Sequence, residues 1–215
     1  MNLILLGPPG TGKGTIAKFI EVRFGLAHIS TGDLLREEVA EKTDIGTRIE
    51  PIMNAGQLVE DQIVIQLLRK RLSQLRKKFI LDGFPRNLAQ GEMLDPLLAE
   101  LGIKIHLVLD IDSDQELIVK RLTSRRQCVK CHRIYGLDVP SKEEGRCDDC
   151  GSETVLRGDD RPEVVRKRLA LYNEVTKPLS DFYEKKNLLH KIDGNRTLQE
   201  IFMEVEKLLA PYIDA

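Results

Sequence analysis

The sequence predicts an α/β fold in which helices cover both faces of a parallel sheet. Short apolar runs alternate along the chain with segments whose apolar residues recur at helical spacing, and this alternation is typical of strand–helix–strand units. The first apolar run leads directly into a glycine-rich loop, as a buried parallel strand commonly does. Since sequential strands usually lie side by side, we expect one parallel sheet as the core.

The expected strands are short apolar runs bounded by turn residues or polar segments. The first run ends at Gly7, and a later one ends at Asp82. Runs of this length suit strands, which typically hold about 3 to 10 residues, better than helices. The five expected strands are residues 2–6, 27–30, 79–81, 105–109 and 188–192.

The first three helices are expected where apolar residues share one face. Ile16, Ile20 and Phe24 define the first helix, directly after the glycine loop. The sequence Ser-Thr-Gly-Asp at 30–33 fits a capping pattern that opens the second. Asp61 is expected to cap a third, longer helix. The apolar face of that helix would consist of Val64, Leu68, Leu72 and Leu75.

The later helices are predicted from their start and stop signals. Ser113, with Glu116 three residues on, is expected to start one helix, and Pro162 lies near the first position of another. Pro178 falls late in that second helix and is expected to kink or end it. Residues 198–209 are expected to form a closing amphipathic helix. Two stretches interrupt the alternation: about 31–60, which is helical, and about 123–160, which holds every cysteine.

The composition excludes several classes of protein. The chain has 215 residues, with 33 Lys+Arg against 34 Asp+Glu and a formal net charge of −1, so it lacks the basic surplus of a nucleic-acid-binding protein. The charges are distributed rather than blocked, which argues against disorder. No apolar run reaches the roughly 18 residues of a membrane span. The run before Gly7 follows no basic segment, so we expect a cytoplasmic protein without membrane partners.

Residues 7–13, Gly-Pro-Pro-Gly-Thr-Gly-Lys, fit the pattern of a phosphate-binding loop between a strand and a helix. Glycines let backbone N–H groups converge on phosphate oxygens, and the following helix adds the positive end of its dipole. Lys13 supplies a mobile charge for the outer phosphates. The general pattern has Ser or Thr after the lysine, whereas Gly14 follows here and Thr15 comes next. A glycine-rich turn without a ligand is the alternative, but strand, loop, lysine and helix agree on a phosphate site.

The same loop sequence is also typical of ring-forming ATPases that act as mechanical motors. Those proteins usually have Thr after the lysine and a later apolar strand that ends in Asp-Glu. Here the run 79–81 is followed by Asp82 and Gly83, so no glutamate stands next to the aspartate to activate water. The sequence therefore disfavours a motor.

Asp82 and Arg86 follow the run 79–81, at the edge where open α/β sheets bind their ligands. A carboxylate at the end of such a strand typically holds Mg²⁺ through water. Any one arginine could be a solvated surface residue, but several lie at segment junctions, which points to bound phosphate groups. Those in or beside the two interrupting stretches are Arg36, Arg121, Arg125, Arg157 and Arg168.

The arginines, together with a missing general base, indicate that the acceptor is itself a phosphate. An alcohol acceptor would call for a base such as the aspartate of a kinase catalytic loop, and the sequence contains no such motif. A phosphate acceptor is already an anionic nucleophile, so the barrier would be repulsion between two polyanions, which guanidinium groups relieve. Such a site must also exclude water. We therefore expect the two interrupting stretches to be lids.

These motifs together resemble the adenylate kinase family of nucleoside monophosphate kinases, and the resemblance extends over the whole chain. It rests on residues 7–15 with their Lys-Gly-Thr ending, which is the family's own form, on Thr-Gly-Asp-Leu-Leu-Arg at 31–36, and on Asp-Gly-Phe-Pro-Arg at 82–86 with Gln90. It continues through Arg121, Arg125, Arg157-Gly158-Asp159-Asp160 and Arg168. The resemblance implies a P-loop NTPase core with a five-stranded parallel sheet, a helical NMP-binding insert and a zinc-ribbon-like lid insert. The implied bounds are 1–30, 60–121 and 161–215 for the core, 31–59 for the AMP-binding insert and 122–160 for the zinc-binding lid.

The resemblance also implies an activity and a set of site residues. The family converts ATP and AMP into two ADP, with Mg²⁺ on the ATP, and we expect a monomer. Expected catalytic residues are Lys13, Arg86, Arg125, Arg157 and Arg168, with Asp82 holding Mg²⁺ through water. Expected ATP contacts are Gly10, Thr11, Gly12, Lys13, Gly14, Thr15, Arg121, Arg125, Ile134, Tyr135 and Arg196. Expected AMP contacts are Thr31, Arg36, Gln57, Leu58, Val59, Gly83, Phe84, Pro85, Arg86, Gln90, Arg157 and Arg168, with Gln90 on the adenine. A kinase for another monophosphate, or with GTP as donor, is the alternative within the family.

The four cysteines have the spacing of a structural metal site. Cys128 and Cys131 are followed, after 15 residues, by Cys147 and Cys150, a pattern that suits tetrahedral Zn²⁺. Because four thiolates leave no open coordination position, the predicted zinc is structural. Free thiols, disulfides and an iron–sulfur cluster are the alternatives. The Cys-x-x-Cys-His sequence at 128–132 also fits haem attachment, which would leave the second pair unexplained.

A zinc ribbon that binds nucleic acid, with regulatory ATP hydrolysis, is the alternative from another functional class. Between Cys128 and Cys150, four basic residues are outnumbered by five acidic ones, so this segment has no basic stripe for phosphates. A short lid builds little core of its own, so a metal cross-link is a reasonable stabiliser. The four histidines are expected to be structural, although His132 stays open as a substitute metal ligand.

Overall fold

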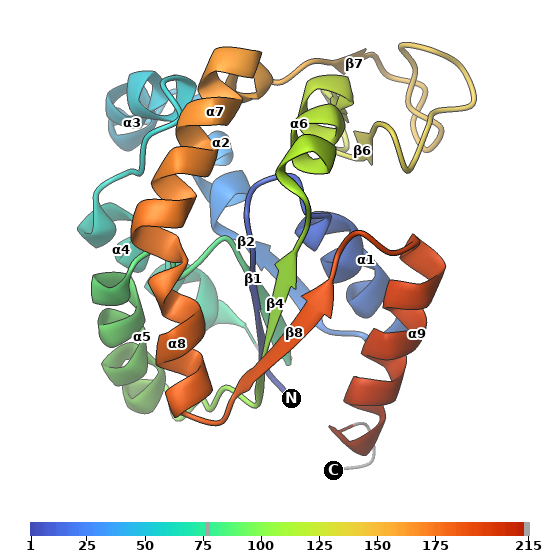
Figure 1. Cartoon of the computed structure of the whole chain (residues 1–215). Coiled ribbons are helices and arrows are strands. Elements are labelled where there is room, and N and C mark those ends of the chain that lie inside the picture. Colours follow the sequence, from blue (N-terminus) through green and yellow to red (C-terminus); the bar gives the residue numbers. More distant parts are fainter. Residues whose placement is uncertain (76–77, 213–215) are drawn as a thin grey trace.

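The computed structural model describes residues 1–75 and 78–212 and is built around a five-stranded parallel sheet of order β2-β3-β1-β4-β8. The first strand is central, since Leu3 lies opposite Ile80 on one side and Leu107 on the other. Figure 1 shows the sheet between two groups of helices. Its strands are β1 (Leu3–Leu6), β2 (Ala27–Ser30), β3 (Phe79–Asp82), β4 (Leu107–Asp112) and β8 (Leu189–Asp193).

Two apolar clusters hold helices against the opposite faces of this sheet. Because successive side chains of a strand point to opposite faces, Leu3 and Leu5 of β1 belong to one cluster and Ile4 and Leu6 to the other. The first cluster binds α1 (Lys13–Phe24) and α9 (Leu198–Leu209). The second binds α4 (Asp61–Gln74), α5 (Leu88–Glu100) and α8 (Pro178–Lys185).

The first interruption of the strand–helix alternation is helical, as predicted. It contains α2 (Thr31–Ala40) and α3 (Asp44–Asn54), which lie against each other. Ser30 caps α2, because its hydroxyl accepts a hydrogen bond of 3.2 Å from the backbone N–H of Asp33. A Cβ at Gly46 of α3 would lie 2.0 Å from the Glu38 carbonyl oxygen of α2, so the two helix backbones approach closely at this glycine.

The second interruption carries a small antiparallel sheet of order β6-β5-β7. Its strands are β5 (Arg126–Cys128), β6 (Ile134–Tyr135) and β7 (Thr154–Val155), which lie between α6 (Gln115–Ser124) and α7 (Pro162–Leu171). Beyond α7 the chain passes through a π-helical turn at Tyr172–Thr176 before Pro178 begins α8. The helix predicted to be kinked or ended by Pro178 thus ends as an α-helix at Leu171, and Pro178 instead begins α8.

The five predicted strands are all present, but one is displaced along the chain. The strand predicted at 105–109 is β4 (Leu107–Asp112), since pairing with β8 extends through Asp110 and Asp112 beyond the apolar run. The sequence does not predict α5, in which Gly91 and Pro96 break the expected helical pattern.

Two predicted helix starts are wrong by one or two residues. Asp61 is the first residue of α4 rather than its cap, and its carboxylate instead accepts hydrogen bonds from Asn87 and Gln90. The helix predicted to start at Ser113 begins at Gln115, with Asp114 as the preceding cap residue and no side-chain cap hydrogen bond.

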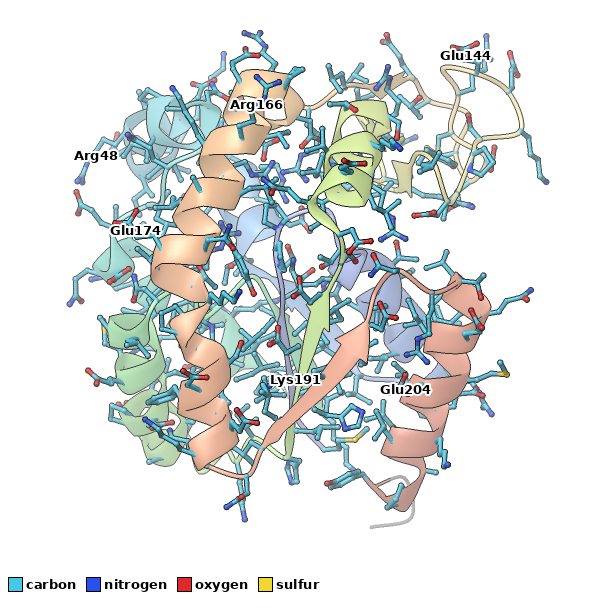
Figure 2. All side chains as sticks on the ribbon, viewed as in Figure 1. Arg48, Glu144, Arg166, Glu174, Lys191 and Glu204 are labelled. Carbon is cyan, nitrogen blue, oxygen red and sulfur yellow. The ribbon has the colours of Figure 1, made fainter. Side chains whose placement is uncertain are left out.

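Charged side chains dominate the outside of the molecule. Figure 2 shows Arg48, Glu144, Arg166 and Glu174 projecting outward from different segments. Within residues 1–75 and 78–212, no helix is both long enough and apolar enough to cross a bilayer. Of the core predicted at 60–121 and 161–215, residues 76–77 and 213–215 lie outside the described part of the chain.

Candidate active site

A cavity of about 1070 Å³ lies at the carboxyl ends of the sheet strands. Small-molecule sites typically measure about 300 to 1,000 Å³, so this one has room for more than one small ligand. Its walls come from the glycine loop, the helical insert and the cysteine-bearing segment together. The predicted site residues that line it are Gly10, Gly12, Lys13, Gly14, Thr15, Thr31, Arg36, Gln57, Leu58, Val59, Asp82, Gly83, Pro85, Arg86, Gln90, Arg121, Arg125, Ile134, Tyr135, Arg157 and Arg168.

Three of the residues predicted to contact the nucleotides do not line this cavity. Thr11 is buried, and its hydroxyl donates to the Pro8 carbonyl oxygen at 3.1 Å. Phe84 is fully buried in the cluster that packs against α5 and α8. Arg196 lies beyond β8, where its guanidinium pairs with Glu204 and donates to the Asp193 carbonyl oxygen.

The glycine loop after β1 folds back against the end of β4. Gly7 has a φ of +135°, and a Cβ there would lie 2.1 Å from the Ile111 carbonyl oxygen, so only glycine fits. The Lys13 ammonium donates to the carbonyl oxygens of Gly7 and Pro8, at 2.8 and 2.7 Å. The lysine thus lies over its own loop, where an anion at the N-terminus of α1 would meet it.

Lys13 and Asp82 form the charged centre of the cavity floor. Burial lowers the pKa of Lys13 to about 8, although the nearby Asp82 opposes this shift. Burial would raise the pKa of Asp82, but the hydrogen bond from His28 and the charge of Lys13 hold it below its usual value. His28 Nε2 lies 3.2 Å from Asp82 Oδ2. Asp82 is therefore an ionised oxygen donor beside the glycine loop.

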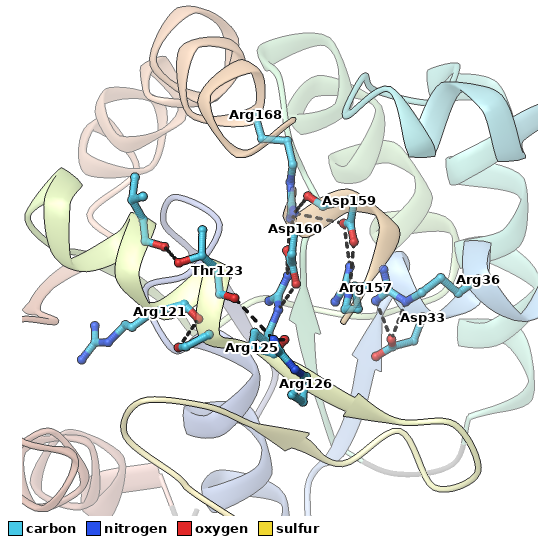
Figure 3. A network of polar contacts seen from close by, with 12 residues as sticks. Asp33, Arg36, Arg121, Thr123, Arg125, Arg126, Arg157, Asp159, Asp160 and Arg168 are labelled. Atoms are coloured by element: carbon cyan, nitrogen blue, oxygen red, sulfur yellow. Dashed lines mark hydrogen bonds and ion pairs between the residues drawn. The ribbon is translucent and has the colours of Figure 1, made fainter. Parts of the chain in front are cut away.

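Four arginines around the cavity are held by aspartates, as Figure 3 shows. Arg125 makes a two-pronged contact with the fully buried Asp160, at 2.7 and 2.5 Å. The remaining pairs all involve arginines from the two interrupting stretches and the helix that follows them. They are Arg168 with Asp160 at 3.1 Å and with Asp159 at 3.0 Å, Arg157 with Asp159 at 2.9 and 2.7 Å, and Arg36 with Asp33 at 3.2 and 2.5 Å.

These ion pairs keep a dense group of positive charges together in the absence of an anion. Burial lowers the pKa of Arg36, and the positive charge of Arg157 lowers it further. Burial would raise the pKa of Asp159, yet Arg168 and Arg157 hold it well below its usual range. Burial lowers the pKa of Arg168 to about 10, so the group remains protonated at neutral pH.

Arg86 lies between the glycine loop and the helical insert. Its Nε donates to the Gly83 carbonyl oxygen at 2.8 Å, and its own carbonyl oxygen accepts from Thr176 at 2.6 Å. The hydroxyl of Thr31 also donates to Gly83 O, at 2.8 Å. One end of the guanidinium is thereby fixed to the backbone, and the group faces the cavity with the other arginines.

Tyr135 connects the cavity wall to the cysteine cluster. The side chain is buried; its hydroxyl donates to Cys147 Sγ at 3.3 Å and accepts from the Asp148 backbone N–H at 2.7 Å. The Arg133 guanidinium lies 5.0 Å from the centre of its ring. Tyr135 therefore supports the cysteine cluster from the side that faces the cavity.

The four cysteine sulfurs fit a tetrahedral metal site. All four Sγ atoms lie within 4.8 Å of one another, with Cys128–Cys150 and Cys131–Cys147 at 3.4 Å. A tetrahedral zinc with Zn–S bonds of about 2.3 Å requires sulfur–sulfur distances of about 3.8 Å. A disulfide would need about 2.05 Å, so the geometry favours metal binding over cross-linking. His132 has no ligand atom in this group.

The sequence analysis does not assign roles to the carboxylates that hold the arginines. Asp33, Asp159 and Asp160 stand inside the motifs that carry the family resemblance, but their positions do not predict that Asp160 pairs with both Arg125 and Arg168. His28 is expected to be structural and instead lies beside Asp82 at the cavity. An aspartate one to three residues from a motif arginine is the signal that could have indicated these local pairs.

Comparisons with known proteins agree with this geometry. The adenylate kinase family model matches residues 5–188. A protein of Archaeoglobus fulgidus named adenylate kinase is 47% identical over 97% of this chain and 98% of its own length. A protein with the same name from Methanothrix thermoacetophila is 46% identical over 99% of this chain and 100% of its own length. Another from Syntrophomonas wolfei is 43% identical over 97% of this chain and 99% of its own length.

Proposed function

The chain belongs to the adenylate kinase family, and from this membership we infer that it catalyses the reversible transfer of a phosphoryl group from ATP to AMP, giving two ADP. The observation that carries this inference is the convergence of Lys13 and the arginines of three separate segments on one cavity. Two polyphosphate ligands that must approach each other require this concentration of positive charge.

We assign the donor nucleotide to the side of the cavity formed by the glycine loop and the cysteine-bearing segment. Glycine-loop backbone N–H groups and the start of α1 bind its phosphates, with Lys13 on the outer ones. Arg121, Ile134 and Tyr135 line the same side. Arg121 is already ordered there, since it donates to Asp138 at 2.6 Å and to the Gly194 carbonyl oxygen at 2.9 Å.

We assign AMP to the side formed by the helical insert. Apolar side chains of Leu58 and Val59 offer contacts for a base, while Thr31 lies at the start of α2. Gln90 lines the same cavity, and we assign it to the adenine. Arg36, Arg86, Arg157 and Arg168 all line the cavity, and we assign them to the AMP phosphate and the transferring group.

The chemistry follows from positioning and electrostatics rather than from a general base. An AMP phosphate oxygen attacks the γ-phosphorus of ATP, and the bond from that phosphorus to the bridging oxygen breaks, releasing ADP. The negative charge spreads over the transferring group, so guanidinium groups that leave their aspartates for phosphate oxygens stabilise it. The segment 122–160 excludes water when it covers the donor, which prevents transfer to water instead.

Two metals complete the proposal. Asp82 fits the position of a Mg²⁺-binding group, because it is an ionised oxygen donor beside the loop that receives the phosphates. When bound, Mg²⁺ would neutralise part of the negative charge of the ATP phosphates. The four cysteines fit a structural Zn²⁺ that stabilises the segment 122–160.

We further propose the domain division predicted above: a core of 1–30, 60–121 and 161–215, an AMP-binding insert of 31–59 and a zinc-binding lid of 122–160. A monomer suffices, because one chain supplies the phosphate-binding arginines from all three parts. Reduced cysteines that hold a metal suit the cytoplasm. No role with nucleic acid or membranes is proposed.

One assay tests the activity. ADP formation is measured with ATP or GTP as donor and with each nucleoside monophosphate as acceptor, and phosphate release is followed without an acceptor. We expect the highest kcat/KM with ATP and AMP and little phosphate release. Preference for another monophosphate or for GTP would replace the substrates proposed here, and phosphate release that needs no acceptor would contradict a transferase.

Arg86→Ala tests the catalytic cluster within the same assay. Removal of one donor to a transferring group typically costs about 10² to 10³ in kcat, so turnover should fall by that order while the thermal midpoint stays nearly unchanged. Arg48→Ala, an exposed arginine of α3, is the matched control and should leave turnover unchanged. Equal turnover of Arg86→Ala and the wild type would remove Arg86 from the mechanism.

A further inference from the structure

The side-chain amide of Gln90 is fixed in one orientation by two partners of opposite kind. Its Oε1 accepts from the Arg86 backbone N–H at 2.7 Å, and its Nε2 donates to Asp61 Oδ1 at 2.7 Å. A backbone N–H can only donate, and an ionised carboxylate can only accept. Turning the amide over would place a donor against a donor and an acceptor against an acceptor, so only one orientation is compatible with both neighbours.

Asp61 holds this arrangement from outside the cavity wall. It is the first residue of α4, while Gln90 lies in the first turn of α5. The same carboxylate accepts from Asn87 Nδ2, at 3.1 and 3.3 Å, and Asn87 Oδ1 in turn accepts from the Gln90 backbone N–H at 2.7 Å. Asp61 therefore orders both the side chain of Gln90 and the residue that caps its helix.

The fixed amide still has hydrogen-bonding capacity for a ligand. A glutamine amide carries two N–H donors and two acceptor lone pairs, and the two contacts described use one of each. Gln90 lines the same cavity as Leu58 and Val59, although only 2% of its surface is exposed. One N–H and one lone pair of known orientation are therefore left for a base that binds there.

Purine bases differ in what such an amide would meet. On its Watson–Crick edge, adenine presents a 6-amino donor beside the N1 acceptor, whereas guanine and hypoxanthine present a 6-oxo acceptor beside an N1–H donor. An amide that matches the first pattern must turn over to match the second. A buried site built for one hydrogen-bonding pattern strongly rejects a ligand that leaves its groups unpaired.

We propose that Asp61 is a specificity-determining positioning residue: by fixing the Gln90 amide, it makes the monophosphate site accept a 6-aminopurine and reject 6-oxopurines. The inference rests on the proposed function, since it places the base of AMP against Gln90. Asp61 does not line the cavity and acts only through Gln90. Discrimination thus depends on an aspartate that touches no substrate.

The test measures kcat/KM with AMP and with IMP, at saturating ATP, for the wild type, Asp61→Asn and Asp61→Leu. The AMP:IMP ratio should fall about tenfold in Asp61→Leu, which corresponds to about 1.4 kcal/mol, and by less in Asp61→Asn, whose amide oxygen still accepts. Both values come from one preparation, so their ratio is independent of the fraction of molecules that fold. The KM for ATP should stay unchanged.

Asp44→Asn is the matched control, because Asp44 is an exposed aspartate at the first position of the neighbouring helix α3. It removes the same helix-terminal charge without touching Gln90, and the AMP:IMP ratio should not change. Direct binding of AMP and IMP, measured by calorimetry on each variant, should show the same loss of discrimination without turnover.

The possible outcomes distinguish a failure of the proposed function from a failure of the role of Asp61. A wild-type protein that does not phosphorylate AMP would overturn the proposed function. A wild type that prefers AMP while Asp61→Leu and Asp61→Asn keep the wild-type ratio would overturn the role of Asp61 alone. A fall of the ratio in Asp44→Asn would also overturn it, because a general charge effect would then explain the result.

Discussion

Four of the arginines proposed to bind phosphate, Arg36, Arg125, Arg157 and Arg168, are paired with aspartates that substrate must replace. Arg125 and Arg168 share the buried carboxylate of Asp160, and Arg157 is held by Asp159. A buried arginine without a partner would be strongly unfavourable, because desolvation of a charge costs several kcal/mol or more. The aspartates therefore keep the arginines folded into the cavity, and the exchange from carboxylate to phosphate replaces one anion with another.

Lys13 has no aspartate of its own within hydrogen-bonding distance among its described contacts, and its affinity for phosphate should depend on pH. Burial lowers its pKa to about 8, so the amine is charged below that pH and becomes neutral above it. The affinity for a non-hydrolysable ATP analogue should be constant up to about pH 7.5 and weaken progressively above pH 8. Calorimetry across this range measures the effect, and NMR titration of the lysine side chain measures the pKa directly.

Two variants distinguish this lysine from other groups. Lys13→Arg keeps its charge throughout this range, so the loss of affinity above pH 8 should disappear even if the binding itself is weaker. Lys18→Arg, at an exposed position of the same helix, should retain the wild-type profile. If the alkaline loss persists in Lys13→Arg, another group must be responsible for it.

At this scale the sequence predicts the cations better than their partners. Lys13 stands in a phosphate-binding loop, and the arginines stand in short motifs or at segment junctions whose family resemblance implies phosphate ligands. Asp61 lies 29 positions from Gln90 and 26 positions from Asn87, and only the packing of α4 beside α5 brings them together. His28 meets Asp82 because β2 and β3 are neighbours in the sheet, which sequence spacing does not reveal.

At the scale of elements, the helical insert depends on the close contact of α2 and α3. α2 carries Thr31 and Arg36, and α3 leads into the cavity-lining segment 57–59. Any change in the spacing of these helices should therefore affect the binding of AMP more than the binding of ATP. At Gly46 the two backbones approach closely, since an added Cβ would overlap with the Glu38 backbone.

Gly46→Ala should raise the KM for AMP about tenfold and lower the thermal midpoint, with the KM for ATP unchanged. Alanine favours a helix by about 0.8 to 1 kcal/mol over glycine, but forcing atoms into a packed contact typically costs about 1 to 3 kcal/mol. The overlap is with backbone atoms, which do not move aside as a side chain can. Steady-state kinetics with varied AMP and varied ATP, together with thermal unfolding, measure both effects.

The control for this element is Glu50→Ala on the exposed side of α3, which should leave both KM values unchanged. A more stable Gly46→Ala protein with wild-type kinetics would show that helix propensity outweighs the contact.

Elements with strong local signals, such as α9 with its capping box at Thr197 and Glu200, are predicted to the residue. The helix α5 is not, because Gly91 packs against Leu179 of α8 and tertiary contact overrides its poor local pattern.

At the scale of the whole molecule, the two interrupting segments are stabilised in different ways. The insert shares the large apolar cluster of the core, to which Leu35 and Ile49 contribute. The segment 122–160 has a separate buried cluster that contains only Cys128, Tyr135 and Cys147 among the described residues. Two of those three are metal-ligand candidates, so we expect metal binding and folding of this segment to be coupled.

Removal of zinc should therefore unfold this segment while the sheet remains intact. We expect a chelator to release about one zinc per chain, by elemental analysis, and to speed hydrogen exchange at the amides of β5, β6 and β7 only. ATP affinity should fall, because Arg125, Ile134 and Tyr135 lose their positions, whereas AMP affinity should change little. Cys131→Ser should reproduce this pattern and Glu144→Ala, an exposed change in the same segment, should not. Loss of protection throughout β1, β3 and β4 would instead show that the metal supports the entire fold, since the segment would then be part of one cooperative unit.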